Sequence, residues 1–502
     1  DENIIAASNM TGTSDEYIEC YVEPGTYYFL VLSYDGNVVG DTPYLLTYDF
    51  DPIIYDDVWI ADELHLGGDG AYSPTGNYSK TFSDIELTNS AYDYYVGRTY
   101  NSRDKIDTHF GRGWIFSFEG KVADLERTFE YADGNIGTHI DGNYKMVKLP
   151  DSSIYIFEKQ KDGSFAAQDS RAKLVNNGNG YTFTTKDRRC YTFNSDGYLT
   201  EMRDKYGNGM RITVNSAGRV QGFTDPTGNT YTVAYGSNGY ISRVTENITG
   251  RSVEYGYTDG VLTSVVNPAG ITTGYEYDAD KYITAVKNSD GVAVETLTYL
   301  PGGDEAKKIG TLTDAYGNTR TYSYNEDENK TVITDSNGRE STQSYDDKKF
   351  ITSSIDAAGR TRSVQYTAVD GKNKFGEIAA ETDEIGNTTS YERDANGNIT
   401  KQTNPDGSYT DYLYDENNNL LWERDSLGNF TLYEYDAQGV KLVKKAKYLN
   451  KVAANETVAL TAENNNLFAA EEYSYYPDET AQIKGLLYRY KNAQGYITEY
   501  TY

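Results

Sequence analysis

A glycine that returns about every 21 residues constrains the fold of this chain more than any other feature of its sequence. A tyrosine follows most of these glycines at the fifth or the seventh place, and five of them have tyrosines at both, as Tyr275 and Tyr277 follow Gly270. A period of this length is typical of one supersecondary unit stacked on copies of itself. The repeated glycines are Gly207, Gly228, Gly250, Gly270, Gly291, Gly317, Gly338, Gly359, Gly386, Gly407 and Gly428.

The residues around each glycine predict a β-hairpin. The glycine ends an Asp/Asn-x-x-Gly quartet, in which the Asp or Asn side chain bonds its own backbone and the glycine accepts a positive φ. The next stretch alternates, as in Thr431-Leu-Tyr433-Glu-Tyr435, so both tyrosines lie on one face of a strand. A Tyr-Asp-x-x-Gly turn and a return strand complete two strands of about seven or eight residues each. The tyrosines on which this prediction depends are Tyr255, Tyr257, Tyr275, Tyr277, Tyr322, Tyr324, Tyr412, Tyr414, Tyr433 and Tyr435.

Replacements of the first tyrosine indicate that it lies on a buried face. Ile212, Val233 and Val364 stand there in three repeats. Gln343 at the same place, and Arg393 at the place of the second tyrosine, are exceptions that we expect at edges or openings. Because one hairpin cannot bury a face, we expect neighbouring hairpins to pair edge to edge into one long coiled sheet in an all-β protein.

The repeated glycine, the Tyr-x-Tyr-Asp sequence and the second glycine resemble the YD (Rhs) repeat family over roughly residues 176–502. Upstream, Arg98-Thr-Tyr-Asn-Ser102 and Phe110-Gly-Arg-Gly-Trp114 resemble the domain that opens Rhs shells. The resemblance implies that the hairpins spiral into a hollow β-shell around a C-terminal toxin or other cargo. Tc toxin C-components, Rhs polymorphic toxins and teneurins share this arrangement.

The family's repeats end in a self-cleaving, aspartate-containing motif before a variable effector, and nothing in this sequence resembles that motif. The last repeat, Asn492-Ala-Gln-Gly495 with Tyr500 and Tyr502, stops at its second tyrosine. We therefore expect the chain to be a fragment of a shell, with its cargo missing, and we do not carry the payload's activity over to it.

The sequence suggests six segments. Residues 1–50 resemble the last strands of a PPC-like β-sandwich, which would be a targeting or binding appendage; the last strands of any other sandwich fit them equally well. The other predicted segments are a linker or junction (51–90), the Rhs N-terminal, shell-opening region (91–200), YD repeats (201–443), an insertion or degenerate repeat with a helix or loop (444–472) and truncated YD repeats (473–502).

Composition narrows the functional class. The formal net charge of −30 argues against binding to nucleic acid or to anionic membranes, because phosphate contacts require Lys and Arg. Cys20 and Cys190 are the two cysteines, which excludes a disulfide framework or a cysteine-based zinc site and favours free thiols over a single bridge. No apolar run is long enough to span a membrane as a helix. Composition and family together predict a secreted or cell-surface protein.

The sequence offers little for catalysis. The three histidines, His65, His109 and His139, are too scattered to nominate a base. Nucleophile-elbow, zinc-protease and P-loop motifs do not occur, and carboxylate pairs are unavoidable among 76 acidic residues. We therefore predict no enzyme activity and no cofactor.

Two ligand classes remain open. The oxygen-rich stretches that begin at Asp335, Asp394 and Asp415 resemble calcium loops, but none continues to the bidentate glutamate, and the same residues suit β-turns. Tyrosine rings stack on sugars, yet a ring on every strand favours a packed wall over a binding site.

The function that the sequence predicts is structural: a β-shell segment that encloses a C-terminal toxin or cargo. The alternative is a surface adhesin that binds glycans, and a weaker one is a glycan-acting enzyme.

Overall fold

The computed structural model describes residues 70–87, 94–104, 106–130, 136–167, 170–301, 307–369, 372–454, 456–461, 463–477 and 486–501. The chain divides into two units, Asp1–Ile53 and Ile54–Tyr502, and all described residues belong to the second. The sandwich predicted for residues 1–50 therefore lies outside the described residues.

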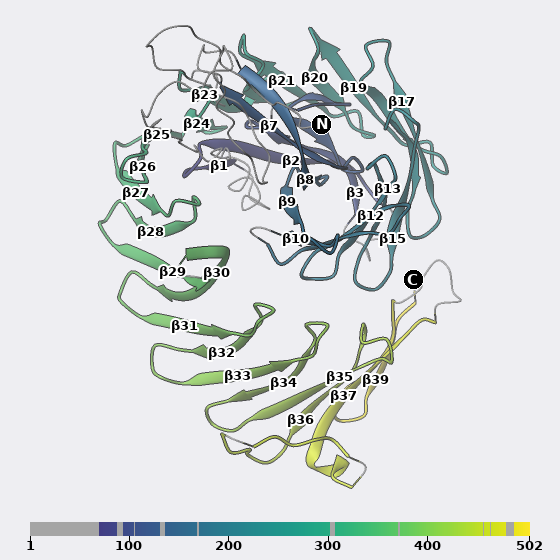
Figure 1. Ribbon diagram of the computed structural model, residues 1–502, viewed down its shortest axis with the longest axis vertical. Coiled ribbons are helices and arrows are strands. Elements are labelled where there is room, and N and C mark those ends of the chain that lie inside the picture. Colours follow the sequence, from purple (N-terminus) through teal and green to yellow (C-terminus); the bar gives the residue numbers. More distant parts are fainter. Residues whose placement is uncertain are drawn as a thin grey trace, which may run out of the picture. The chain divides into compact units, whose positions relative to one another are not determined.

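One antiparallel sheet of 29 strands forms most of the second unit. Its strands pair in chain order from β11 to β39, so each hairpin lies beside the next along a curved path (Figure 1). This confirms the predicted all-β class and the coiled sheet of stacked hairpins. Its strands are β11 (Lys173–Asn176), β12 (Gly180–Thr184), β13 (Cys190–Asn194), β14 (Leu199–Arg203), β15 (Gly209–Val214), β16 (Val220–Thr224), β17 (Thr230–Tyr235), β18 (Ile241–Glu246), β19 (Ser252–Thr258), β20 (Val261–Val266), β21 (Thr272–Tyr277), β22 (Ile283–Lys287), β23 (Ala293–Tyr299), β24 (Ile309–Asp314), β25 (Thr319–Asn325), β26 (Lys330–Asp335), β27 (Glu340–Tyr345), β28 (Ile351–Ile355), β29 (Thr361–Val369), β30 (Lys372–Thr382), β31 (Thr388–Arg393), β32 (Ile399–Thr403), β33 (Tyr409–Tyr414), β34 (Leu420–Asp425), β35 (Phe430–Tyr435), β36 (Leu442–Tyr448), β37 (Phe468–Tyr475), β38 (Leu487–Lys491) and β39 (Ile497–Glu499).

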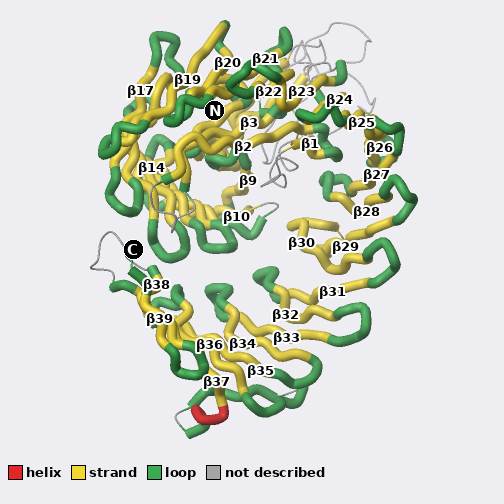
Figure 2. The backbone as a smooth tube through the Cα atoms, turned by 180° about the vertical axis from the view of Figure 1, so that it is seen from behind, coloured by secondary structure: helices red, strands yellow, loops and turns green. Residues whose placement is uncertain are grey.

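Three smaller sheets precede the long one, with strand orders β1-β2-β3-β6, β10-β9-β8-β7 and β4-β5. Figure 2 shows β2 and β3 within the curve of the long sheet. We call strands β1–β6, with their connections, the inner segment. The strands are β1 (Gly70–Tyr72), β2 (Asn77–Glu86), β3 (Tyr95–Asn101), β4 (Asp107–Thr108), β5 (Gly111–Arg112), β6 (Trp114–Phe116), β7 (Lys121–Glu130), β8 (Ile136–Lys148), β9 (Ile154–Lys159) and β10 (Phe165–Ala167).

The hairpin strands are shorter than the sequence predicts. Most have five or six residues: β15, β16 and β17 contain six, five and six. The turns take up the difference: the Gly207 amide donates to the Asp204 carbonyl, and the Asp204 amide donates to the Asn208 carbonyl (3.1 and 2.9 Å). Each turn therefore uses five residues before the ladder begins.

Part of the predicted junction at 51–90 is not a linker. Residues 70–72 and 77–86 form β1 and β2, and the Tyr78 side chain is fully buried. Side chains of alternating polarity in Asn77–Glu86 indicate a strand, but the Gly and Pro residues before them suggested a loop. The linker assignment is therefore wrong for this stretch.

The segment predicted as an insertion at 444–472 contains most of β36, a connecting loop and the first residues of β37. Strand β36 pairs directly with β37, and the helix among the described residues there is η1 (Asn465–Leu467), a single 3-10 turn. Residues 449–454 and 456–461 form an outer strap, in which the Val452 amide donates to the Gly428 carbonyl (2.9 Å). On the outer sheet face, Arg424 donates to the Ala453 and Glu456 carbonyls of the strap (2.8 and 2.9 Å), and Phe430, which pairs with Arg424, is fully buried.

In the described part of the chain, no helix has the length and apolar character needed to cross a membrane.

Candidate functional site

In most of the repeats that have the second tyrosine, its hydroxyl joins neighbouring hairpins. The Tyr277 hydroxyl donates to the Leu262 carbonyl (2.6 Å), and the Tyr435 hydroxyl donates to the Leu420 carbonyl (3.1 Å), each 15 residues back. The backbone ladder between the two hairpins has already ended, at Ser264 opposite Gly274 in the first case. The hydroxyl therefore replaces a missing ladder bond where the twisted strands separate. Equivalent hydroxyls belong to Tyr235, Tyr257, Tyr324, Tyr366 and Tyr475.

Arg393 performs the same task without a tyrosine. Its Nε and Nη2 atoms donate to the Ile378 carbonyl (3.3 and 3.0 Å), again 15 residues back. A third bond reaches the Gly397 carbonyl (2.9 Å). The other exception, Gln343, accepts a hydrogen bond from the Ser73 hydroxyl of the inner segment. Arg393 and Gln343, the two exceptions to the tyrosine pattern, thus each have defined hydrogen-bond partners.

The Asp side chains of these turns accept hydrogen bonds from backbone amides of the same turn. Asp394 Oδ1 accepts the amides of Asn396 and Asn398 (2.9 and 2.8 Å), and its Oδ2 accepts the Asn398 side chain (3.0 Å). The stretches at Asp335 and Asp415 do the same. These bonds are the turn chemistry that the sequence suggests. Among the described residues, no group of three or more His, Cys, Asp and Glu side chains is arranged to hold a metal ion.

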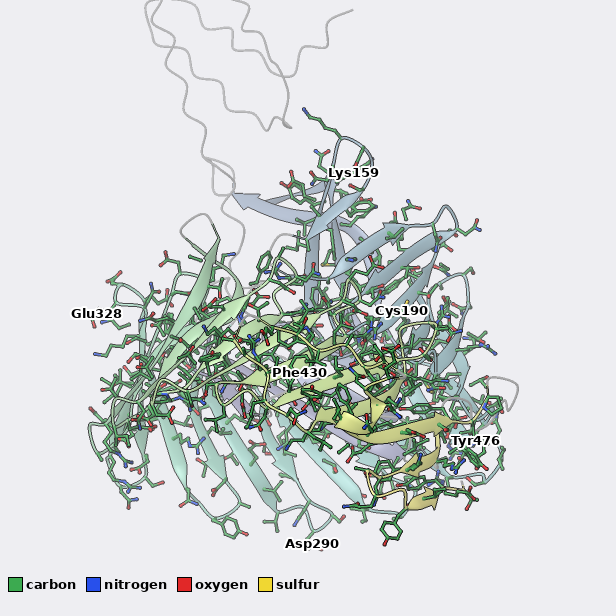
Figure 3. The ribbon with its side chains drawn as sticks, turned by 90° about the horizontal axis from the view of Figure 1, so that it is seen from below. Lys159, Cys190, Asp290, Glu328, Phe430 and Tyr476 are labelled. Atoms are coloured by element: carbon green, nitrogen blue, oxygen red, sulfur yellow. The ribbon has the colours of Figure 1, made fainter. Side chains whose placement is uncertain are left out.

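All the repeated glycines have positive φ values, between 74° and 93°. They lie on a common edge of the sheet, and Figure 3 shows Asp290 at one of its tips. The strap contacts this edge at Gly428. A Cβ atom added at Gly317 would have no neighbour within 4 Å. The glycines of the Tyr-Asp-x-x-Gly turns lie on the opposite edge, which is packed: a Cβ atom at Gly397 would lie 1.9 Å from Glu377 Oε1.

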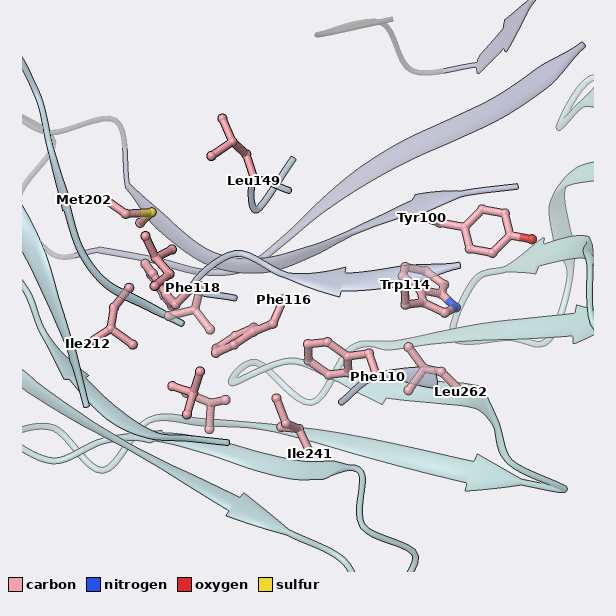
Figure 4. Packing of buried hydrophobic residues seen from close by; sticks show 14 of the residues in the cluster. Tyr100, Phe110, Trp114, Phe116, Phe118, Leu149, Met202, Ile212, Ile241 and Leu262 are labelled. Carbon is pink, nitrogen blue, oxygen red and sulfur yellow. The ribbon is translucent and has the colours of Figure 1, made fainter. Parts of the chain in front are cut away.

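The inner segment covers the tyrosine face of the first half of the long sheet. Figure 4 shows Phe110 and Trp114 next to Ile241 and Leu262, all in one buried cluster. Backbone bonds tie the two parts together, since the Ile241 amide donates to the His109 carbonyl (2.9 Å). The first tyrosines of three repeats are buried here: Tyr255, Tyr275 and Tyr322, at 5%, 4% and 4% exposure.

A buried ion pair fixes the inner segment on this face. The Arg98 guanidinium contacts the Asp84 carboxylate, and both side chains are at most 5% exposed. Arg98 also donates to the Tyr275 hydroxyl, and the Tyr255 hydroxyl donates to Asp84 (3.0 Å). Burial, opposed by Arg98, raises the pKa of Tyr275 to about 12. The Trp114 indole donates to the Tyr277 hydroxyl (3.0 Å), so both tyrosines of this repeat hold the inner segment.

The inner face changes chemistry along the sheet. The residue opposite the first tyrosine is apolar in the covered half: Val265 faces Tyr255, and Ile333 faces Tyr322. Later repeats place a polar residue there. The polar pairs are Gln343 with Ser354, Val364 with Glu381, Tyr391 with Gln402, Tyr412 with Glu423 and Tyr433 with Lys445.

The switch coincides with the end of the covering segment. The last hydrogen bonds that we find from the inner segment run from the Tyr72 hydroxyl to the Lys349 carbonyl (2.6 Å) and from Ser73 to Gln343. Beyond this point Tyr412 and Tyr433 are half-buried rather than buried. We call this part of the tyrosine face, over β28–β38, the polar wall.

Carboxylates bind the tyrosine hydroxyls of the polar wall. Tyr391 donates to Glu381 and Tyr433 donates to Glu423, each at 2.8 Å. Burial, and then these glutamates, raise the pKa of both tyrosines. These glutamates were not predicted from the sequence. The available signal was a glutamate ten residues before the tyrosine that it binds, on the neighbouring strand.

Of the histidines and cysteines, the structure describes the side chains of His109 and Cys190. His109 Nδ1 lies 2.8 Å from Glu119 Oε1, and its ring packs edge-on against Tyr235. His65 and the side chain of His139 lie outside the described residues, as does Cys20. Cys190 is a half-buried free thiol.

The fold and this face define a repeat protein whose unit is a tyrosine-locked hairpin. Two family models match the chain: the RHS repeat at residues 373–409, and a domain of unknown function (DUF6531) at residues 73–138, which includes most of the inner segment. The tRNA nuclease WapA of Bacillus subtilis (strain 168) is 26% identical over 344 residues, covering 58% of this chain and 14% of that protein. Teneurin-1 of Homo sapiens is 30% identical over 95 residues, covering 19% of this chain and 4% of that protein.

A solved Tc holotoxin pore of Photorhabdus luminescens has a TM-score of 0.40 and 11% identity, and the match covers 84% of this chain and 26% of that chain. The chain spans 14% or less of these two curated relatives. The family models, the relatives and the periodic hairpins support the RHS/YD-repeat family, which confirms the resemblance seen in the tyrosine repeats.

Proposed function

We propose that this chain is a segment of a shell and that its polar wall surrounds another polypeptide segment, expected to follow the repeats in the same protein. The observation that supports this is the change of the inner face at β28. Where the sheet covers its own inner segment, its face is apolar and buried; past that segment the face is polar and half-exposed.

The change matters because a permanently buried face gains stability from apolar side chains, at about 25 cal/mol per Å². A face that meets water or a loosely held occupant must stay wettable, since exposed apolar surface favours aggregation. The polar wall combines tyrosine rings with paired charges, such as Arg362 with Glu381 (2.8 Å). It can therefore face a second polypeptide without binding it tightly.

The mechanism we propose is enclosure, and it requires no catalytic residue. The WapA relatives are named as tRNA nucleases, and we place any such activity in the enclosed segment rather than in these repeats. Export to the cell surface or the medium is part of the same proposal.

A photo-crosslinking amino acid at Tyr412 tests it in the longer natural polypeptide. Tyr412 lies on the polar wall, and its neighbour Leu413 lies on the outer face with 44% exposure, which makes Leu413 a matched control. We expect crosslinks from position 412 to the segment that follows the repeats and none from 413. Equal crosslinking from both positions would refute enclosure, and crosslinks to glycans would favour the adhesin.

A further inference from the structure

The first strands of the long sheet meet its last third along a polar seam. Arg171 forms two hydrogen bonds to the Glu377 carboxylate, both at 2.9 Å. The Lys186 ammonium donates to the Gly397 carbonyl (2.7 Å). Arg188 donates to the Gly439 carbonyl (2.9 Å) and, with its other nitrogen, to the Asn419 side chain (2.7 Å). We define the seam by these contacts.

No backbone ladder crosses the seam in the described part of the chain. The strands of the long sheet pair in chain order, so β11–β13 have no rungs to β30–β36. The seam is also loosely filled. Arg171 borders two cavities of about 540 and 610 Å³, the first with Lys186 and Arg189, the second with Tyr391 and Arg393. A contact of this kind lacks the apolar packing that makes an interface rigid.

The seam matters mechanically because of what it holds. Strands β31–β39, which we call the arm, continue the sheet from the β30–β31 ladder, at Ala380 to Thr382. Among the described residues, the hydrogen bond from the Tyr72 hydroxyl of the inner segment reaches Lys349, before the arm begins. The described contacts thus hold the arm at its root by a ladder and further along by the seam.

We propose that the seam is a gate in the shell wall. When its bonds break, the arm swings about its root and opens the space in front of the polar wall. This rests on the proposed function, because a gate is useful only if that space holds an occupant. The chemistry favours reversible opening. Three cations hold the seam. Arg171 and Lys186 flank the partly exposed Glu377 carboxylate, so salt weakens their attraction to it. Arg188 donates to two neutral oxygens, for which water can substitute when the seam opens.

A distance measured across the seam tests the gate in the 502-residue chain alone. After Cys20 and Cys190 are replaced by serine, spin labels are attached at Lys205 and Glu416 by cysteine substitution. Both side chains are exposed, and they belong to turns on opposite sides of the seam. We expect one short distance at low salt and a growing longer population as salt rises.

The double variant Lys186→Glu with Arg188→Glu should open the gate further. Each lost charge-assisted bond should raise the ratio of long to short distances about tenfold, which corresponds to about 1.4 kcal/mol. Arg360→Glu is the matched control, because Arg360 pairs with Asp356 inside its own turn (2.6 Å). We expect the control to keep the wild-type distance.

An unchanged distance in the folded double variant, or one insensitive to salt in the wild type, would overturn the gate. If the double variant fails to fold, the wild-type salt series decides alone. The distance measurement needs no occupant, so it tests the gate separately from the proposed function. If the arm moves but Tyr412 gives no crosslinks, the sheet is mobile and the proposal that it encloses a segment fails.

Discussion

Arg393 offers a sharp test of how the hairpins are joined, because it replaces the tyrosine of other repeats but donates to the same kind of carbonyl. Arg393→Leu removes the bonds to the Ile378 carbonyl (3.0 and 3.3 Å) and to the Gly397 carbonyl (2.9 Å). A hydrogen bond from a charged donor contributes about 1.5–3 kcal/mol and a neutral one about 0.5–1.5 kcal/mol. We therefore expect leucine to cost about 2 kcal/mol locally and Arg393→Tyr to cost less than about 1 kcal/mol.

Hydrogen exchange followed by mass spectrometry measures this locally, which suits a long repeat array better than one global unfolding midpoint. A loss of 2 kcal/mol corresponds to about thirtyfold faster amide exchange in β30–β32, whereas the tyrosine variant should stay within about sixfold of wild type. Peptides from β15–β20 serve as the internal control. If tyrosine exchanges as fast as leucine, Arg393 acts through its charge and not as the substitute donor, and the reasoning fails.

Three further results are expected. Arg98→Met should lower the free energy of unfolding by about 3–5 kcal/mol, because it leaves the buried Asp84 carboxylate unpaired. Adding Asp84→Leu should restore most of the lost thermal midpoint. Equal midpoints for the single and the double variant would contradict this. The free energy of unfolding should fall as pH rises from 10 towards 12, because Tyr275 has a pKa of about 12 in the folded chain and about 10 in the unfolded chain. This pKa difference corresponds to about 2.7 kcal/mol, which denaturant titration at several pH values would detect. An unfolding free energy that does not change over this range would count against burial of the Tyr275 hydroxyl. Gly397→Ala should destabilise more than Gly317→Ala, because both positions share the positive-φ strain but only the former meets another atom, Glu377 Oε1 at 1.9 Å; equal denaturation midpoints would argue against the packed edge.

The hairpins were predictable because their signals are local. An Asx residue and a glycine set each turn, as at Asp204 and Gly207, and the two tyrosines set the face. Register follows from the turn, so the strand order of the long sheet needed no long-range information. Strand length was overestimated because the turn's own bonds shorten the ladder.

The contacts between distant parts were not predictable. Arg98 lies 177 residues from Tyr275, and no local pattern announces that the two meet. Lys186 and Gly397 meet across the seam only because of the accumulated twist of the strands between them. The alternation of polar and apolar residues in β2 was present but short, and the Gly and Pro residues before it suggested a linker. The polar wall could have been found by comparing the return strands repeat by repeat, where Val265 becomes Glu423.

The most direct test of the account is a cryo-electron microscopy structure of the full-length natural polypeptide, with density examined against the polar wall. We predict additional density from the segment after the repeats, enclosed by β28–β38 and contacting the tyrosines paired with Glu381 and Glu423. A polar wall that faces bulk solvent, with the following segment placed outside the sheet, would contradict the account.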